Sequence, residues 1–91
     1  MRKFVMIYDT TPESLVKARE HFPAHRERLD EFHARGTLLM AGNLIDGSGR
    51  ALGIFTTQEA AEEFVAGDPF VIHGVVVKTT IAPWNEVLFG G

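Results

Sequence analysis

His25 carries a side chain that could perform acid–base chemistry. It shares one stripe of a predicted helix with Phe22, Leu29 and Phe32, because these residues follow one another at spacings of three, four and three. An imidazole on an apolar stripe needs a hydrogen-bond partner, since an unmatched buried polar group costs about 1–3 kcal/mol. Two interpretations stay open: a core histidine bonded to the backbone, or an acid–base group in a pocket.

Asp68 is the second candidate. It precedes Pro69 and Phe70, and an aspartate before proline is typical of a helix N-cap. The other interpretation is that its carboxylate orients the imidazole of His25, as carboxylates do in many acid–base sites. The separation along the chain is too long for spacing to decide between them.

A metal site is not expected. His21 and His25 have the i, i+4 spacing that could hold a metal on an unbroken helix, but Pro23 lies between them and no cysteine or third ligand is apparent. No companions are apparent for His33 and His73, which are expected to be structural or exposed. No cofactor is expected either, because the glycines of residues 46–50 do not lead from a strand into a helix as a phosphate loop does.

Aromatic side chains could complete a substrate pocket. Phe22, Phe70 and Trp84 are the candidates for substrate binding. A core or interface position is the alternative for the tryptophan. No Ser/His/Asp or Cys/His nucleophile signature is present.

The elements that must position these residues alternate along the chain. Strands are predicted near residues 2–8, 37–45, 51–57 and 74–82, the last ending at Pro83. Helices are predicted from the Thr11 cap to about 21, from Pro23 to about 35, and from the Thr57 cap to about 67, with a short turn at 68–69. This β-α-β-β-α-β order predicts an α+β, ferredoxin-like fold with a four-stranded antiparallel sheet.

The first strand predicts a homodimer. Its run Phe4–Tyr8 is apolar on both faces, and two helices can cover only one face of the sheet. A second copy is the simplest cover for the other face, which we expect to include some of Val75, Val77 and Ile81 or their neighbours. A monomer with a partly solvated sheet is the alternative.

Composition narrows the class of protein. The 91 residues fit a single domain, 1–91. Nine Lys and Arg against twelve Asp and Glu give a net charge of −3, and no basic stripe predicts nucleic-acid binding. No apolar run is long enough to span a membrane and no secretory segment is apparent. With no cysteine in the chain, the expected compartment is the cytoplasm.

Several motifs in order resemble the YciI-like (YCII-related) family. They are residues 22–29 (FPAHRERL), 36–42 (GTLLMAG), 59–61 (EAA), 68–70 (DPF) and 74–75 (GV). The resemblance implies a ferredoxin-like fold that pairs into a dimeric α+β barrel, with His25 and Asp68 as the active-site pair. The chain departs from the family pattern at Phe22, where arginine is frequent, and at Asn43, where proline commonly follows the glycine. Both departures suggest a different ligand.

The first hypothesis for function is a cofactor-independent enzyme that uses His25 and Asp68 on a small substrate. The resemblance implies that the substrate could be a chlorinated, quinol-type aromatic, because family activity includes dehydrochlorination of such compounds. The alternative is a non-catalytic, dimeric module that binds a small ligand in the same pocket. An interaction domain without a ligand is a third hypothesis.

Overall fold

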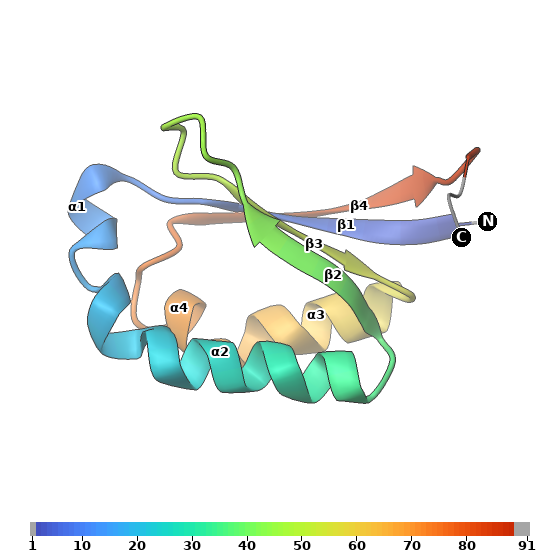
Figure 1. The fold of residues 1–91 in the computed structure, drawn as a ribbon, viewed down its shortest axis with the longest axis horizontal. Helices are drawn as coiled ribbons and strands as arrows, with labels where there is room; N and C mark the ends of the chain where they lie inside the picture. The colour runs from blue at the N-terminus through green and yellow to red at the C-terminus, as the bar shows by residue number, and fades with distance from the viewer. Residues whose placement is uncertain (1, 89–91) are drawn as a thin grey trace.

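An antiparallel sheet with helices on one face forms the structure, a computed structural model that describes residues 2–88 (Figure 1). The strands are β1 (Arg2–Asp9), β2 (Leu38–Asn43), β3 (Ala51–Phe55) and β4 (Lys78–Asn85). The helices are α1 (Pro12–Leu15), α2 (Ala18–Ala34), α3 (Gln58–Gly67) and α4 (Pro69–Ile72). The sheet order is β2-β3-β1-β4 with antiparallel neighbours, so the predicted α+β, ferredoxin-like fold is confirmed.

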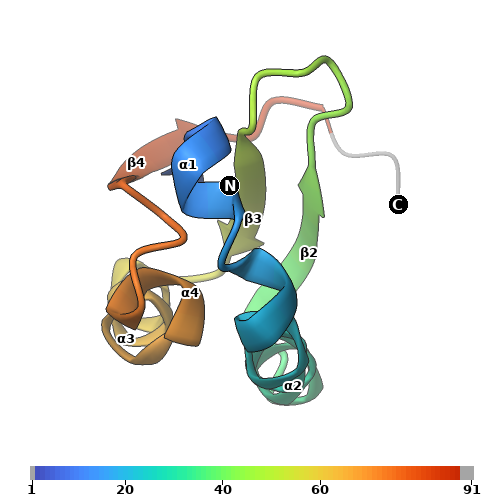
Figure 2. The same cartoon turned by 90° about the vertical axis from the view of Figure 1, so that its left-hand side faces the viewer.

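The central strand β1 divides its side chains between two environments. Met6 and Tyr8 are buried and belong to the core beneath the sheet, whereas Val5 and Ile7 alternate with them and are half-buried on the opposite face. Figure 2 shows α2 on one side and α3 with α4 on the other, all beneath the same face of the sheet. The apolar run of β1 therefore has helices on one side only.

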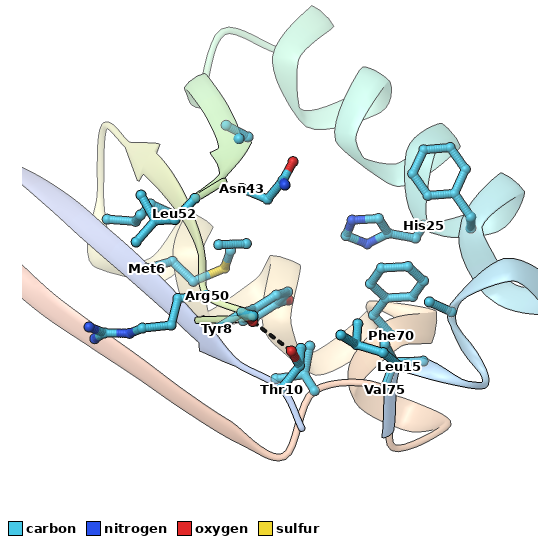
Figure 3. A pocket seen from close by; sticks show the side chains of 18 of the residues that line it. Met6, Tyr8, Thr10, Leu15, His25, Asn43, Arg50, Leu52, Phe70 and Val75 are labelled. Carbon is cyan, nitrogen blue, oxygen red and sulfur yellow. Dashed lines mark hydrogen bonds between the residues drawn. The ribbon is translucent and has the colours of Figure 1, made fainter. Parts of the chain in front are cut away.

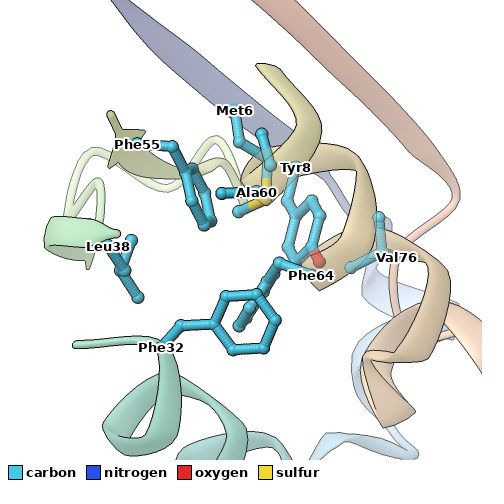
Figure 4. Packing of buried hydrophobic residues seen from close by; sticks show 9 residues of the cluster. Met6, Tyr8, Phe32, Leu38, Phe55, Ala60, Phe64 and Val76 are labelled. Atoms are coloured by element: carbon cyan, nitrogen blue, oxygen red, sulfur yellow. The ribbon is translucent and has the colours of Figure 1, made fainter. Parts of the chain in front are cut away.

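Three phenylalanines join the helices to the sheet. Phe64 of α3 meets Phe32 of α2 edge-on, with ring centroids 5.2 Å apart, and lies 5.5 Å from Phe55 of β3 (Figure 4). All three side chains are fully buried. Burial of one such ring stabilises the fold by about 1.5–3 kcal/mol, so this cluster fixes α2 and α3 against the strands.

The predicted helix starts are confirmed by their caps. Thr11 Oγ1 accepts a hydrogen bond from the Ser14 N–H at 3.0 Å, and Pro12 occupies the first turn. Thr57 Oγ1 accepts one from the Ala60 N–H at 3.1 Å. Each hydroxyl satisfies a backbone donor that has no partner inside the helix.

The predicted break at Pro23 was wrong. The chain leaves the helical path earlier, between α1 and α2, and α2 continues through Pro23. An interior proline costs about 3 kcal/mol. Contacts on both sides of Pro23 offset that cost: His21 before it stacks on His73, and His25 after it is buried.

The predicted end of the fourth strand was also wrong. β4 begins at Lys78, later than expected, and passes through Pro83, which pairs with Phe4. An edge strand tolerates proline, because one of its sides has no neighbour that needs the missing N–H. The valines expected at the start of this strand lead from α4 into it instead, and the Val76 N–H bonds to the Phe70 carbonyl at 2.9 Å.

The uncovered sheet face differs from the predicted row of side chains. Val75 is buried and Ile81 packs against the core, so these two residues do not line the open face, whereas Ala82, the neighbour of Ile81, does. The strand register instead places an apolar set on that face: Val5, Ile7, Leu52, Ile54 and Ala82. The physical basis of the prediction, a first strand that is apolar on both faces, stands.

Candidate active site

A cavity of about 370 Å³ lies between α2 and the sheet (Figure 3). It is beside the C-terminal end of β2 and the N-terminal end of β3. Its walls are mostly apolar. They include Met6, Leu15, Ala18, Phe22, Leu29, Leu44, Phe70, Val75 and Val76. Five polar or charged side chains also line it: Tyr8, Thr10, His25, Asn43 and Arg50.

His25 lines this cavity, and Asp68 contacts His25 from the protein interior. Nδ1 of His25 lies 2.8 Å from Oδ1 and 3.0 Å from Oδ2 of Asp68. His25 keeps 9% of its surface exposed and Asp68 keeps none. α2 supplies the imidazole, and the junction between α3 and α4 supplies the carboxylate. Two segments far apart in sequence are thus joined by a buried hydrogen bond.

The carboxylate of Asp68 is surrounded by donors. The Phe70 N–H donates to Oδ1 at 3.1 Å and the Tyr8 hydroxyl donates to Oδ2 at 2.7 Å. An ionised carboxylate only accepts hydrogen bonds, so the proton in the contact with His25 belongs on Nδ1. Asp68 therefore both caps α4 and contacts His25.

Nε2 of His25 is left for the cavity. Among residues 2–88 every buried side-chain nitrogen or oxygen has a hydrogen-bond partner, and the only bonds of the His25 ring run from Nδ1. Nε2 is therefore accessible from the cavity that His25 lines. With the proton held on Nδ1, it presents a lone pair.

Aromatic rings fix the plane of the imidazole. Phe70 stacks on His25 with centroids 3.9 Å apart and planes within 3°. Phe64 meets the ring edge-on at 6.4 Å, and Phe22 lies tilted at 6.3 Å. Together with the Asp68 bond, these contacts restrict rotation of His25 and aim Nε2 in one direction.

Tyr8 is the site residue that the sequence reasoning missed. It is buried on β1, and burial followed by its hydrogen bond to Asp68 raises the pKa of its hydroxyl well above the usual range. It therefore remains a donor to the carboxylate. Its position beside Met6 on the core side of a strand could have marked it as buried, but no sequence signal names Asp68 as its partner.

Trp84 does not reach the cavity. It lies on β4 opposite Lys3, which is two residues from Val5 on β1 and therefore on the same, open face. Pro83 was expected to end the strand, but β4 continues and carries the tryptophan along the sheet. Phe22 and Phe70, in contrast, both line the cavity.

The other histidines have structural contacts. His33 Nδ1 lies 2.9 Å from the Leu38 carbonyl oxygen, which joins α2 to β2. His21 stacks on His73 with centroids 4.0 Å apart, so His73 has a companion that the sequence did not indicate.

In the described part of the chain, no three His, Cys, Asp or Glu side chains are grouped to hold a metal. None of the helices there has the length and apolar character needed to cross a bilayer.

Fold and site together define a ferredoxin-like domain with an apolar cavity lined by a histidine that is hydrogen-bonded to a buried carboxylate. A family model for the YCII-related domain matches residues 1–85, and the chain belongs to that family. Protein YciI of Escherichia coli O6:H1 is 30% identical over 95 aligned residues, which cover 92% of this chain and 97% of that protein. Protein YciI of Shigella flexneri matches to the same extent.

Solved structures share the fold at low sequence identity. One is 5-chloro-2-hydroxyhydroquinone dehydrochlorinase from Burkholderia phenoliruptrix in complex with 2,5-dihydroxybenzoquinone. It is 19% identical with a TM-score of 0.76, covering 91% of this chain and 93% of that one. A putative antibiotic biosynthesis monooxygenase from Deinococcus radiodurans is 12% identical with a TM-score of 0.58, covering 100% and 97%.

Proposed function

We propose that this protein is a cofactor-independent enzyme in which His25 acts as general base and acid on a small hydroxylated aromatic substrate. The observation that carries the proposal is that the two nitrogens of the His25 ring have different surroundings. Nδ1 is hydrogen-bonded to Asp68, and Nε2 is accessible from the cavity. Asp68 then acts as the positioning residue that keeps the reactive nitrogen unprotonated and aimed.

The geometry suits removal of a hydroxyl proton. Nε2 takes the proton, and the carboxylate of Asp68 stabilises the imidazolium that forms. Apolar walls favour a flat ring over water, and the aromatic side chains of Phe22 and Phe70 line the cavity. An enzymatic proton transfer of this kind contributes about 10²- to 10⁴-fold in rate.

The dehydrochlorinase with the same fold suggests the reaction. In a chlorinated hydroxyhydroquinone, loss of hydroxyl protons drives the ring electrons toward the carbon that bears chlorine. That carbon takes one proton back, and chloride leaves with the C–Cl electron pair. The net change is loss of one H⁺ and one Cl⁻ to give a hydroxyquinone, so no external oxidant is needed. Phe22 and Phe70 hold the ring, and His25 moves the protons.

The proposed enzyme is a cytoplasmic homodimer. The open sheet face made by Val5, Ile7, Leu52, Ile54 and Ala82 is a contiguous apolar surface without a helix to cover it. Such a surface on a small protein favours association, and a second copy placed face to face buries it with two-fold symmetry.

Chloride release from 5-chloro-2-hydroxyhydroquinone tests the function. The native protein should release chloride faster than buffer, and His25→Ala should release it at the buffer rate while its circular dichroism spectrum remains native. The matched control is His33→Ala, which removes a histidine from the same helix but outside the cavity. If the native protein binds quinols in a calorimeter but releases no chloride from any chlorinated quinol, the non-catalytic ligand-binding module is the correct function.

A further inference from the structure

Asn43 places an amide on the wall of the cavity opposite His25. It is the last residue of β2, and its side chain points from that strand toward the side where His25 lies (Figure 3). Within residues 2–88 no protein group forms a hydrogen bond with this amide. This is the position where the family pattern commonly has a proline, which could supply no such group.

The remaining polar side chains of the cavity are already engaged. The Tyr8 hydroxyl donates to Asp68, and the Thr10 hydroxyl donates to the Gly49 carbonyl at 2.6 Å. The guanidinium of Arg50 pairs with the Asp9 carboxylate at 3.1 Å and points away from His25 (Figure 3).

Two uncommitted polar groups therefore face the cavity: Nε2 of His25 and the amide of Asn43. They extend from α2 and from β2, on different walls. A ligand that satisfies both must carry two polar functions directed to different edges, with an apolar body between them to match the walls.

We infer that Asn43 is a specificity-determining residue that binds a second oxygen of the substrate while the first lies at Nε2 of His25. The inference rests on the proposed function and narrows its substrate class to flat rings with oxygen functions on opposite edges. A side-chain amide both donates and accepts, so Asn43 accommodates a hydroxyl or a carbonyl oxygen. It therefore contacts both a quinol and the quinone formed from it.

Phenol and hydroquinone are the matched probes, since they differ by one hydroxyl on the opposite edge of the ring. Titration of ¹⁵N-labelled protein by NMR gives both affinities. The side-chain amides available as reporters are only those of Asn43, Gln58 and Asn85. Hydroquinone should bind about 3- to 10-fold more tightly than phenol, the range of one neutral hydrogen bond. Among these three side-chain amides, only that of Asn43 should respond differently to the two probes: its signals should shift when hydroquinone is added and should stay in place when phenol is added.

Asn43→Leu keeps the approximate shape and removes the amide. In this variant the preference for hydroquinone should disappear while the affinity for phenol changes less than about twofold. Asn85→Leu, on β4, is the control and should keep the preference. If hydroquinone and phenol both bind the native protein but the preference is absent, or survives Asn43→Leu, the role of Asn43 is overturned and the proposed function stands. If neither probe perturbs the ring signals of His25, the proposed function fails and the inference fails with it.

Discussion

The Tyr8 hydroxyl donates a 2.7 Å hydrogen bond to Oδ2 of Asp68 inside the protein core. This bond ties the central strand of the sheet to the start of α4. Because the same carboxylate also accepts from Nδ1 of His25, Tyr8 determines where the acid–base pair stands relative to the sheet. The site is held by a strand, a helix and a helix cap together.

Tyr8 should resist ionisation in the folded protein. It is the only tyrosine in the chain, so tyrosinate absorbance at 295 nm reports on this group alone. Burial and the bond to Asp68 raise its pKa above the ordinary value of 10.0. At pH 11 we expect no tyrosinate signal in native protein and about nine-tenths of the full signal in urea. A native titration midpoint near pH 10 would contradict the buried hydrogen bond.

The same group should make stability fall in alkali. Its contribution is fully present below the unfolded pKa of 10.0 and is lost as pH rises, because the unfolded chain releases the tyrosine proton and the folded chain retains it. Between pH 9 and 11 this residue should lower the free energy of unfolding by about 1.4 kcal/mol in total. Urea titrations of native protein and Tyr8→Phe over this range measure it. The native protein should lose about 1.4 kcal/mol more than Tyr8→Phe, and equal losses would refute the assignment.

The Asp68→Asn variant should distinguish the role of Asp68 in positioning His25 from its role as the N-cap of α4. Asparagine is an equally good N-cap, so α4 should remain formed, but its NH2 group replaces one acceptor oxygen among the donors around Asp68, which should lower the free energy of unfolding by about 1–3 kcal/mol. The carboxylate that stabilises an imidazolium is lost, and chloride release should fall about 10- to 100-fold, a part of the 10²- to 10⁴-fold that a positioned acid–base group contributes. Unchanged turnover in this variant would show that Asp68 is only a cap.

The sequence predicts the order of elements because each carries a local signal. Thr11 and Thr57 mark helix starts, and the apolar residues of β1 mark a buried strand. The break before α2 and the passage of β4 through Pro83 were not predictable, since tertiary burial and an edge position decide them. His25 was identified by its stripe and Asp68 through the family resemblance, but the contact of Asp68 with Tyr8 depends on sheet register.

Ile54→Asp should disrupt the proposed dimer. Ile54 pairs with Val5 and lies within the open apolar face, where a charge could not be desolvated without large cost. Light scattering should give about twice 10.1 kDa for the native chain and the single mass for the variant. Val16→Asp, at a side chain that is 81% exposed at the end of α1, is the control and should stay dimeric. A native protein that elutes as a monomer at micromolar concentration would refute the dimer.

Gly49→Ala should destabilise the loop between β2 and β3 that borders the cavity. Gly49 has φ +75°, and a Cβ there would stand 2.5 Å from Thr10 Oγ1, whose bond to the Gly49 carbonyl would break. We expect a loss of about 1–3 kcal/mol in the free energy of unfolding by urea. Gly42→Ala is the control, because a Cβ there meets nothing within 4 Å. Equal stability of the two variants would show that the loop tolerates the change.

The tautomer of His25 tests the central claim most directly. Long-range ¹H–¹⁵N correlation spectra at pH 8.5 distinguish a protonated from a bare ring nitrogen, and loss of signals in His25→Gln assigns the ring among the four histidines. The structure predicts a proton on Nδ1, donated to Asp68, and a bare Nε2 whose ¹⁵N shift moves when hydroquinone is added. A proton on Nε2 with bare Nδ1, or an Nε2 signal unmoved by every quinol tested, would contradict the account.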